Sequence, residues 1–269
     1  MPGAPNALTA RIIEDLGFQA VYLTGAGLTN THLGLPDLGF MDLGQVTEHV
    51  LAIRGVVQLP LIVDIDTGFG NAINVAHTVR TLEQACASPV QVEDQRAPKR
   101  CGHFAGKELI SAAEMVGKVR AAADAGRQDM VIIARTDACA VEGFEAAIDR
   151  ASRYIEAGAD MTFVEAPETL EDLRRVPDRL AAPQLVNMVL GGKTPIIDAA
   201  AAGEMGFALY ANAALQAAIQ GMQTTLKALK QAGVLDERTV TSFAERQRLV
   251  GEATFDAMEL RYAAGAPTS

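Results

Sequence analysis

Short apolar runs alternate with longer amphipathic segments along almost the whole chain. Most of these runs are nearly continuous in apolar character, which is typical of parallel strands that are covered on both faces. Seven strands are predicted on this basis, over Phe18–Thr24, Leu59–Asp66, Pro89–Asp94, Met130–Thr136, Met161–Glu165, Gln184–Met188 and Phe207–Tyr210.

The segments between the predicted strands have the spacing of amphipathic helices. The clearest are Glu142–Ala157 and Ala213–Ala232, in which apolar side chains return every three or four positions. Regular alternation of strand and helix predicts βαβ units that share one parallel sheet. Such a sheet can be open and doubly wound, or it can close into a barrel.

Polar side chains cluster where the predicted strands end and the next helices have not yet begun. In a closed barrel these ends converge on one mouth, whereas in an open sheet they would spread along a line. The expected fold class is therefore α/β, with a single (β/α)8 barrel of the TIM type. The polar residues at strand ends are Asp64, Asp66, Glu93, Arg135, Asp137, Glu165 and Asn187.

The two ends of the chain depart from a regular barrel. Pro2-Gly3-Ala4 resembles the end of a first strand, directly before a helix predicted over Asn6–Leu16, so we expect a truncated first strand. Residues 1–269 are predicted to form a single barrel domain, with 236–262 as a helical extension and 263–269 as a loose tail. The extension has no remaining strand to cover, so we expect it to pack on a neighbouring subunit.

Composition narrows the class of partner. A length of 269 residues with 49% hydrophobic content suits one globular domain with a large core. The formal net charge of −10 opposes binding to nucleic acids and anionic membranes, so a small-molecule partner is expected.

Cys86, Cys101 and Cys139 have no paired or CxxC spacing, which suits a reducing compartment. Because no secretory pattern or membrane-spanning run is present, we expect a cytoplasmic protein.

Asp64 and Asp66 are alternate residues at the end of one predicted strand. Strict alternation would point both carboxylates into the barrel, where they would repel each other unless a cation lay between them. Oxygen ligands favour a hard divalent ion such as Mg²⁺, and Glu93 could join directly or through water. Asp-x-Asp pairs are common, so this pair is a metal candidate only in combination with its neighbours.

The run from Lys99 to His103 places a thiol among cations and an imidazole, just after the strand that carries Glu93. A thiol near positive charge loses its proton more readily, so Cys101 could exchange a proton with a carbanion at neutral pH. The alternative is a small apolar residue in a loop. His32, His49 and His77 lack such neighbours and are interpreted as structural.

Motifs along nearly the whole chain, in the same order, resemble the isocitrate lyase and phosphoenolpyruvate mutase superfamily. The loop from Lys99 to His103 is the most specific, and it resembles the lyase branch that contains the 2-methylisocitrate and 2,3-dimethylmalate lyases. The other matching segments are Tyr22–Gly27, Leu33–Asp37, Asp64–Gly70, Glu93–Gln95, Ala134–Asp137 and Asn187-Met188.

The resemblance implies a barrel whose last helix is swapped between subunits, with a homotetramer built from two helix-swapped dimers. It also implies Mg²⁺ or Mn²⁺ as the cofactor and a bond broken beside an α-keto acid. The metal ligands would be Asp64, Asp66 and Glu93, and Cys101 would be the general acid. The catalytic set would also contain Lys99, His103 and Arg135, and the substrate-binding set Tyr22, Thr24, Gly25, Ala26, Asp37, Arg100, Gly102, Glu165 and Asn187.

The expected activity is cleavage of a 2-hydroxy di- or tricarboxylate into an α-keto acid, such as pyruvate, and a second carboxylate. Two departures leave the substrate open, because related lyases carry Glu at the position of Leu190 and His at that of Gln91. The alternatives are oxaloacetate decarboxylation or hydrolysis on the same metal site, phosphonate chemistry suggested by Gly191-Gly192-Lys193, and a barrel that binds a keto acid without catalysis.

Overall fold

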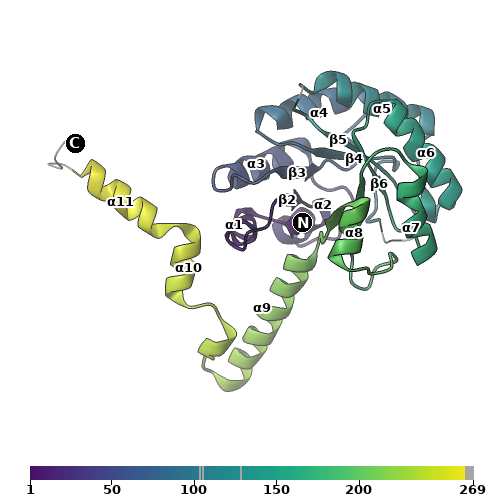
Figure 1. The fold of residues 1–269 in the computed structure, drawn as a ribbon. Coiled ribbons are helices and arrows are strands. Elements are labelled where there is room, and N and C mark those ends of the chain that lie inside the picture. The colour runs from purple at the N-terminus through teal and green to yellow at the C-terminus, as the bar shows by residue number, and fades with distance from the viewer. Residues whose placement is uncertain (103, 105, 128, 264–269) are drawn as a thin grey trace. The chain divides into compact units, whose positions relative to one another are not determined.

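The computed structural model describes residues 1–102, 104, 106–127 and 129–263. Eight parallel strands follow one another around a nearly closed barrel, with helices between them (Figure 1). The predicted (β/α)8 barrel is therefore confirmed. The strands are β1 (Gly3–Ala4), β2 (Val21–Leu23), β3 (Leu61–Asp64), β4 (Val90–Glu93), β5 (Ile132–Thr136), β6 (Met161–Val164), β7 (Gln184–Asn187) and β8 (Gly206–Leu209).

Several helices begin at a side chain that caps their first turn. Asp42 and Asn71 each form a capping box, with Gln45 and Asn74 respectively, so that exposed backbone N–H groups of the first turn gain acceptors. The helices are α1 (Ala7–Asp15), α2 (Gly25–Leu28), α3 (Leu43–Arg54), α4 (Ala72–Gln84), α5 (Ala112–Ala125), α6 (Phe144–Glu156), α7 (Leu170–Arg179), α8 (Ala199–Met205), α9 (Ala213–Ala232), α10 (Phe243–Val250) and α11 (Glu252–Tyr262), with short turns η1 (Thr29–Leu33), η2 (Ala138–Ala140) and η3 (Glu237–Thr239).

The seven strands predicted from apolar runs are all present, each within three residues of its expected limits. The short first strand is present too, because Gly3 and Ala4 pair with Tyr22 and Leu23 of β2. Backbone hydrogen bonds close the barrel on the other side, where Gly3 N–H donates to Tyr210 O at 3.1 Å and Tyr210 N–H donates to Met1 O at 2.9 Å.

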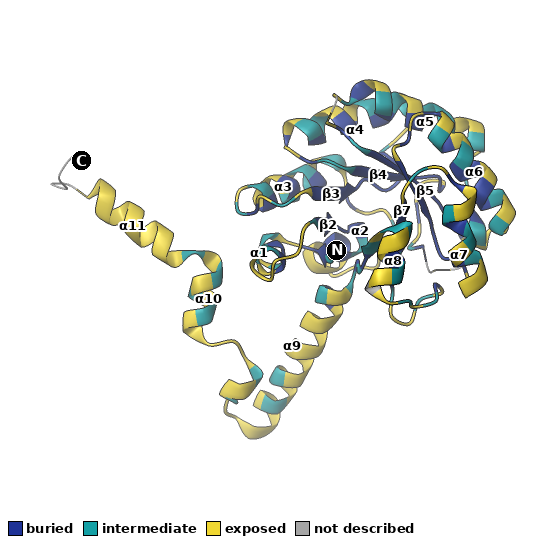
Figure 2. Ribbon diagram, viewed as in Figure 1, coloured by how far each residue is buried: buried dark blue, intermediate teal, exposed yellow. Residues whose placement is uncertain are grey.

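Apolar side chains fill the barrel from several strands at once. One buried cluster contains Tyr22, Ile62, Ile133, Phe163 and Leu185, each from a different strand. Inward side chains of alternate residues pack in this way in barrels of this type. The strands are almost entirely buried and the surrounding helices are buried on one side only (Figure 2). The polar residues above this packed interior therefore lie on a rigid base.

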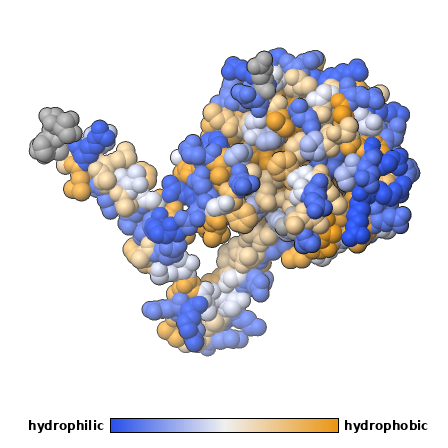
Figure 3. Space-filling model, in the orientation of Figure 1, coloured by the Kyte–Doolittle hydropathy of each residue, from blue (hydrophilic) through white to orange (hydrophobic). Residues whose placement is uncertain are grey.

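The chain divides into two compact units, Met1–Leu215 and Gln216–Ser269. The second contains most of α9 and the extension predicted over 236–262, and the tail beyond 263 lies outside the described residues. Within it, the Thr225 hydroxyl donates to Thr239 O at 3.1 Å, but no residue of α10 or α11 is buried. Apolar atoms are visible on its surface beside polar ones (Figure 3). Within the described residues, none of the helices has both the length and the apolar character needed to cross a membrane.

Candidate active site

One small cavity lies at the carboxyl ends of the strands, with a volume of about 40 Å³. Active sites of enzymes with this fold occupy the same end of the barrel. Because the cavity is small, the side chains that line it can reach the same small ligand. Most residues predicted for the site line it, namely Tyr22, Thr24, Ala26, Asp37, Asp64, Lys99, Cys101, Gly102, Arg135, Glu165 and Asn187.

Four of the described residues predicted for the site do not line this cavity. Gly25, Asp66 and Glu93 are buried directly beside residues that do. Arg100 is exposed, and its backbone N–H donates to the Gln95 side chain at 2.9 Å. His103 lies outside the described residues.

Asp64 and Asp66 converge on the backbone at Gly25. A Cβ atom on Gly25 would lie 2.9 Å from Asp66 Oδ1 and 3.3 Å from Asp64 Oδ2, so the two carboxylates face the same small space. The Asp66 backbone N–H donates to Asp64 Oδ1 at 3.1 Å, which fixes the orientation of the first carboxylate. Asp66 lies beyond the end of β3 with a φ of +49°, so strict strand alternation does not bring the two carboxylates together. They approach each other through the turn after β3, with glycine opposite.

Lys99 provides the positive charge beside this pair. Its Nζ lies 2.6 Å from Asp37 and 2.9 Å from Asp66 Oδ1, and its side chain is only 5% exposed. Burial works against the charged lysine, but the surrounding carboxylates outweigh burial and raise the Lys99 pKa well above its ordinary value. Burial also raises the pKa of Asp66, and although Lys99 lowers it, Asp64 adds to the rise and the pKa reaches about 6.

The acidic pair fits a magnesium ion bound partly through water. No group of three or more His, Cys, Asp or Glu side chains arranged to hold a metal occurs in the described part of the chain. Mg²⁺ typically takes one or two protein carboxylates and keeps several waters, so it does not require such a group. Two converging carboxylates supply the oxygen donors, and a cation would offset the repulsion from Asp64, which adds to the effect of burial on the Asp66 pKa.

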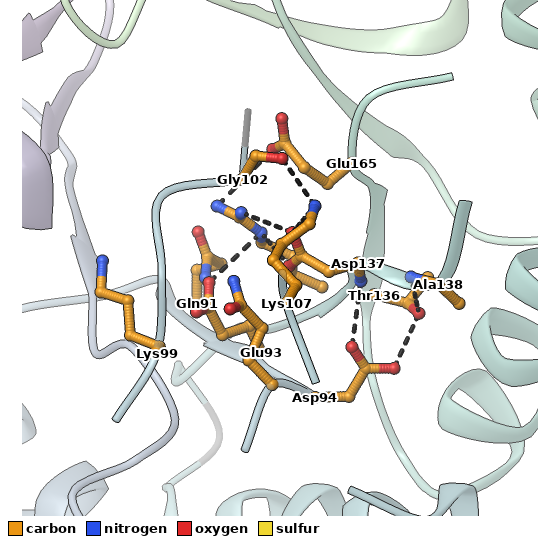
Figure 4. A network of polar contacts seen from close by, with 12 residues as sticks. Gln91, Glu93, Asp94, Lys99, Gly102, Lys107, Thr136, Asp137, Ala138 and Glu165 are labelled. Carbon is orange, nitrogen blue, oxygen red and sulfur yellow. Dashed lines mark hydrogen bonds and ion pairs between the residues drawn. The ribbon is translucent and has the colours of Figure 1, made fainter. Parts of the chain in front are cut away.

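Arg135 lies at the centre of a second buried network, which contains Glu93, Asp137 and Glu165 (Figure 4). Its Nε lies 2.9 Å from Asp137 Oδ2 and 3.3 Å from Glu93 Oε2, and its Nη1 lies 3.5 Å from Glu165 Oε2. The register of β4 and β5 pairs Glu93 with Arg135 directly, so the contact follows from the sheet itself. The Arg135 guanidinium also lies over the Phe163 ring, 5.0 Å from its centre. Three acidic neighbours hold this cation in place.

Charge coupling sets the ionisation of this network. Burial alone would raise the pKa of Asp137, but Arg135 and Lys107 outweigh burial and lower it to about 2. Burial raises the pKa of Glu93 well above its ordinary value, despite the opposing effect of Arg135. Glu93 Oε1 is buried and has no hydrogen-bond partner among the described residues. Glu93 is therefore an acidic side chain with one oxygen that a ligand could engage.

Several residues at or beside the cavity are missing from the sequence prediction, among them Asn212 in the lining and the two buried polar residues Lys107 and Gln91 next to it. Lys107 is buried, and its Nζ donates to Gly102 O at 2.6 Å and to Asp137 Oδ1 at 2.7 Å. Gln91 is fully buried in β4, where it accepts a hydrogen bond from the Tyr22 hydroxyl and donates to Asp64 Oδ1 at 3.3 Å. Gln91 could have been identified from the sequence, because it is a polar residue inside an otherwise apolar strand. No pattern marks Lys107.

The loop after β4 brings Cys101 to the cavity. Cys101 is partly exposed and lines the same cavity as Asp64 and Arg135. Thr24 also lines the cavity, and its hydroxyl caps α2 by accepting from Gly27 N–H at 3.4 Å. Leu190 is 69% exposed and outside the cavity lining.

Comparison with known proteins identifies relatives over most of the chain. A family profile described as phosphoenolpyruvate phosphomutase matches residues 1–230. The 2,3-dimethylmalate lyase of Eubacterium barkeri is 42% identical over 271 residues, with 98% of this chain and 93% of the relative covered. The 2-methylisocitrate lyase of Aeropyrum pernix is 46% identical over 234 residues, with 86% of this chain and 75% of the relative covered.

Solved structures with the same fold include two that carry ligands. Oxaloacetate acetylhydrolase with the inhibitor 3,3-difluorooxalacetate superposes with a TM-score of 0.92 at 34% identity, covering 100% of this chain and 92% of the other. Phosphonopyruvate hydrolase with oxalate and Mg²⁺ has a TM-score of 0.87 at 30% identity, covering 97% and 93%. These structures contain small dicarboxylate ligands, and the second also contains a divalent metal.

Proposed function

This chain belongs to the phosphoenolpyruvate mutase and isocitrate lyase superfamily and is a carbon–carbon lyase, and from this premise we propose that it cleaves a 2-hydroxy di- or tricarboxylate. The products are an α-keto acid, such as pyruvate, and a second carboxylate. One observation carries the proposal, namely that Cys101, Asp64 and Arg135 line one cavity at the catalytic end of the barrel.

Different residues of the cavity act in different steps of the reaction. The substrate hydroxyl gives its proton to a carboxylate of the cavity wall, the adjacent carbon–carbon bond breaks, and the hydroxyl carbon becomes the keto carbon. The electron pair of the broken bond stays on the carbon beside the second carboxylate. Cys101 gives its thiol proton to that carbon, and Arg135 pairs with a substrate carboxylate, for which its fork-shaped guanidinium is suited.

Asp64 and Asp66, with Glu93 through water, are proposed to hold Mg²⁺ or Mn²⁺. A bound divalent ion supplies a Lewis acid that stabilises negative charge on the oxygen of the keto acid. Two features support this assignment: the two carboxylates converge beside the cavity, and a related hydrolase has a structure with Mg²⁺ and oxalate. The backbone at Gly25 and Ala26 and the Thr24 hydroxyl are proposed to receive the carboxylate of the keto-acid half.

A panel of hydroxy acids tests the proposed reaction. The full chain with Mg²⁺ is incubated with 2,3-dimethylmalate, 2-methylisocitrate and isocitrate, and release of the keto acid is followed with a coupled dehydrogenase. Cys101→Ser is expected to lose lyase activity by about a thousandfold, because an alcohol is a much weaker acid than a thiol. Cys86→Ser, at an exposed cysteine outside the cavity, is the matched control. Turnover of none of the hydroxy acids, or full activity of Cys101→Ser, would contradict the proposal.

Oxaloacetate is the second candidate substrate, because the oxaloacetate acetylhydrolase structure covers the whole chain. Hydrolysis produces oxalate and acetate, whereas decarboxylation produces pyruvate and carbon dioxide, so the products separate these reactions. Decarboxylation does not need the thiol as an acid and should survive in Cys101→Ser. If oxaloacetate alone is consumed, the lyase proposal is replaced. If Mg²⁺ and oxalate bind calorimetrically while no substrate is consumed, the barrel is a keto-acid-binding protein.

We also propose a cytoplasmic homotetramer built from two dimers that exchange C-terminal helices. Large apolar side chains are exposed on these helices, including Leu226, Phe243, Phe255 and Leu260, and a second copy of the chain would cover them. The described cysteines form no disulfide, which supports a reducing compartment. Light scattering after size-exclusion chromatography is expected to give the mass of four chains. A monomer at micromolar concentration would contradict the assembly.

A further inference from the structure

Lys107 is buried to an extent that is unusual for a lysine. Its side chain is only 1% exposed, and lysines at such depth are almost always paired. Its Nζ donates to two oxygens that come from different parts of the chain, Gly102 O at 2.6 Å and Asp137 Oδ1 at 2.7 Å. Lys107 therefore connects the loop after β4 to the end of β5.

Asp137, the partner of Lys107 at the end of β5, is held by several hydrogen bonds. Asp137 accepts hydrogen bonds from Arg135 Nε at 2.9 Å and from Arg135 Nη2 at 3.1 Å. Its own backbone N–H donates to Asp94 Oδ1 at 3.0 Å. Asp137 is fully buried, so it has little freedom to follow the loop if the loop moves. The contact with Lys107 consequently fixes the loop relative to the strand.

On the loop side, the contact acts on the residue next to Cys101. Gly102 lies against Arg135 and Glu165, and its carbonyl is turned toward Lys107 (Figure 4). Upstream, Gln95 holds the Arg100 backbone through hydrogen bonds of 2.8 Å and 2.9 Å. Cys101 therefore lies between two fixed points, the Arg100 backbone and the Gly102 carbonyl.

We propose that Lys107 is a positioning residue that holds the Gly102 carbonyl on Asp137 and thereby sets the place of the Cys101 thiol in the cavity. The role of Cys101 as the acid of a lyase rests on the proposed function. The effect of Lys107 on the location and accessibility of the thiol does not. Lys107 itself lies outside the cavity lining.

Thiol alkylation measures this positioning without any substrate. The test uses the full chain with Cys86→Ser and Cys139→Ala. Of the three cysteines in the sequence, only Cys101 then remains. Alkylation by iodoacetamide is followed to the high-pH plateau, where the thiol is fully ionised and the rate no longer depends on the fraction of thiolate. Lys107→Met is expected to raise the plateau rate by about tenfold, because the loop loses its charged hydrogen bonds.

The matched control is Lys118→Met, which also removes a buried lysine. Lys118 Nζ donates to Thr67 O at 2.9 Å, on a different strand end. This variant is expected to lose stability while its Cys101 alkylation rate stays within about twofold of the parent. If both variants raise the rate equally, Lys107 has only a general stabilising role and the proposal is overturned.

Lys107→Gln provides a milder change if Lys107→Met does not fold. Its shorter amide cannot place one nitrogen on both oxygens, so the alkylation rate should still rise, by about threefold. A folded Lys107→Met or Lys107→Gln protein with the parent's alkylation rate would overturn the inference. If alkylation responds as expected but no hydroxy acid is cleaved by the parent, the positioning role stands and the lyase reaction alone is rejected.

Discussion

A Cβ atom on Gly102 would lie 2.3 Å from the Arg135 Nη2 atom, a separation that no real side chain shows. The same atom would lie 2.8 Å from the carboxyl carbon of Glu165. Only glycine allows the backbone beside Cys101 to rest directly on the buried charge network of β5 and β6. The presence of Gly102 is thus a steric requirement of the site.

Gly102→Ala should therefore lower lyase activity while the barrel stays folded. The added methyl group pushes the loop away from Arg135, and a displacement of about 1 Å at a reacting group can cost about a hundredfold in rate. The measurement is kcat/KM beside thermal unfolding. Gly117→Ala in α5, where the added Cβ meets open space, should keep its activity and gain up to about 1 kcal/mol of stability. Activity of Gly102→Ala within tenfold of the wild type would contradict the steric argument.

The strands and the site that they position could be predicted because they depend on local patterns. Parallel strands that are buried on both faces appear as apolar runs, and their carboxyl ends must meet at one mouth. Asp64, Arg135 and Asn187 follow directly from that rule, and all three line the cavity. The pairing of Glu93 with Arg135 then depends only on the register of two neighbouring strands.

Loops carry no such periodicity, and there the sequence was less informative. Lys99 and Arg100 are adjacent cations, yet Lys99 is buried among carboxylates while Arg100 is exposed. Nothing in the sequence distinguishes them, because the direction of a loop side chain depends on the path of the whole loop. Lys107 was missed for the same reason, since its partners Gly102 and Asp137 belong to separate segments.

Asp137 should contribute a part of the stability that disappears in acid. Its folded pKa of about 2 lies below the ordinary 3.8, so the stabilising contribution is complete above about pH 4 and is lost as the pH falls through 2. A shift of this size corresponds to roughly 2 kcal/mol. Urea unfolding of the wild type and Asp137→Asn is compared between pH 6 and the lowest pH that keeps both folded. The difference in unfolding free energy should shrink toward acid, and a constant difference would count against the charge coupling.

Tyr22 and Gln91 form a buried hydrogen bond that Tyr22→Phe would break. Burial, and then the nearby Asp64, raise the pKa of Tyr22 well above its ordinary value, so the phenol stays protonated and keeps donating. The variant leaves Gln91 Oε1 buried without a donor, which should cost about 1 to 3 kcal/mol of unfolding free energy. Tyr262→Phe, at a position 70% exposed on α11, should change stability by less than about 0.5 kcal/mol. Equal stabilities of the two variants would show that this bond contributes little.

Lys99 and a divalent ion should compete for the same carboxylates. Removal of Lys99 is therefore expected to strengthen metal binding. Lys99 Nζ lies 2.9 Å from Asp66 Oδ1, so Lys99→Met removes a positive charge next to the proposed metal site. Mg²⁺ should then bind more tightly, by about tenfold, because the repulsion between two cations is gone. Isothermal titration with Mg²⁺ is done at about pH 8.5, because burial raises the Asp66 pKa to about 6 even with Lys99 lowering it, and the loss of Lys99 raises this pKa further. The neighbouring exposed Arg100→Met is the control and should change affinity by less than about twofold. Weaker Mg²⁺ binding in Lys99→Met would mean that the metal does not bind at Asp66.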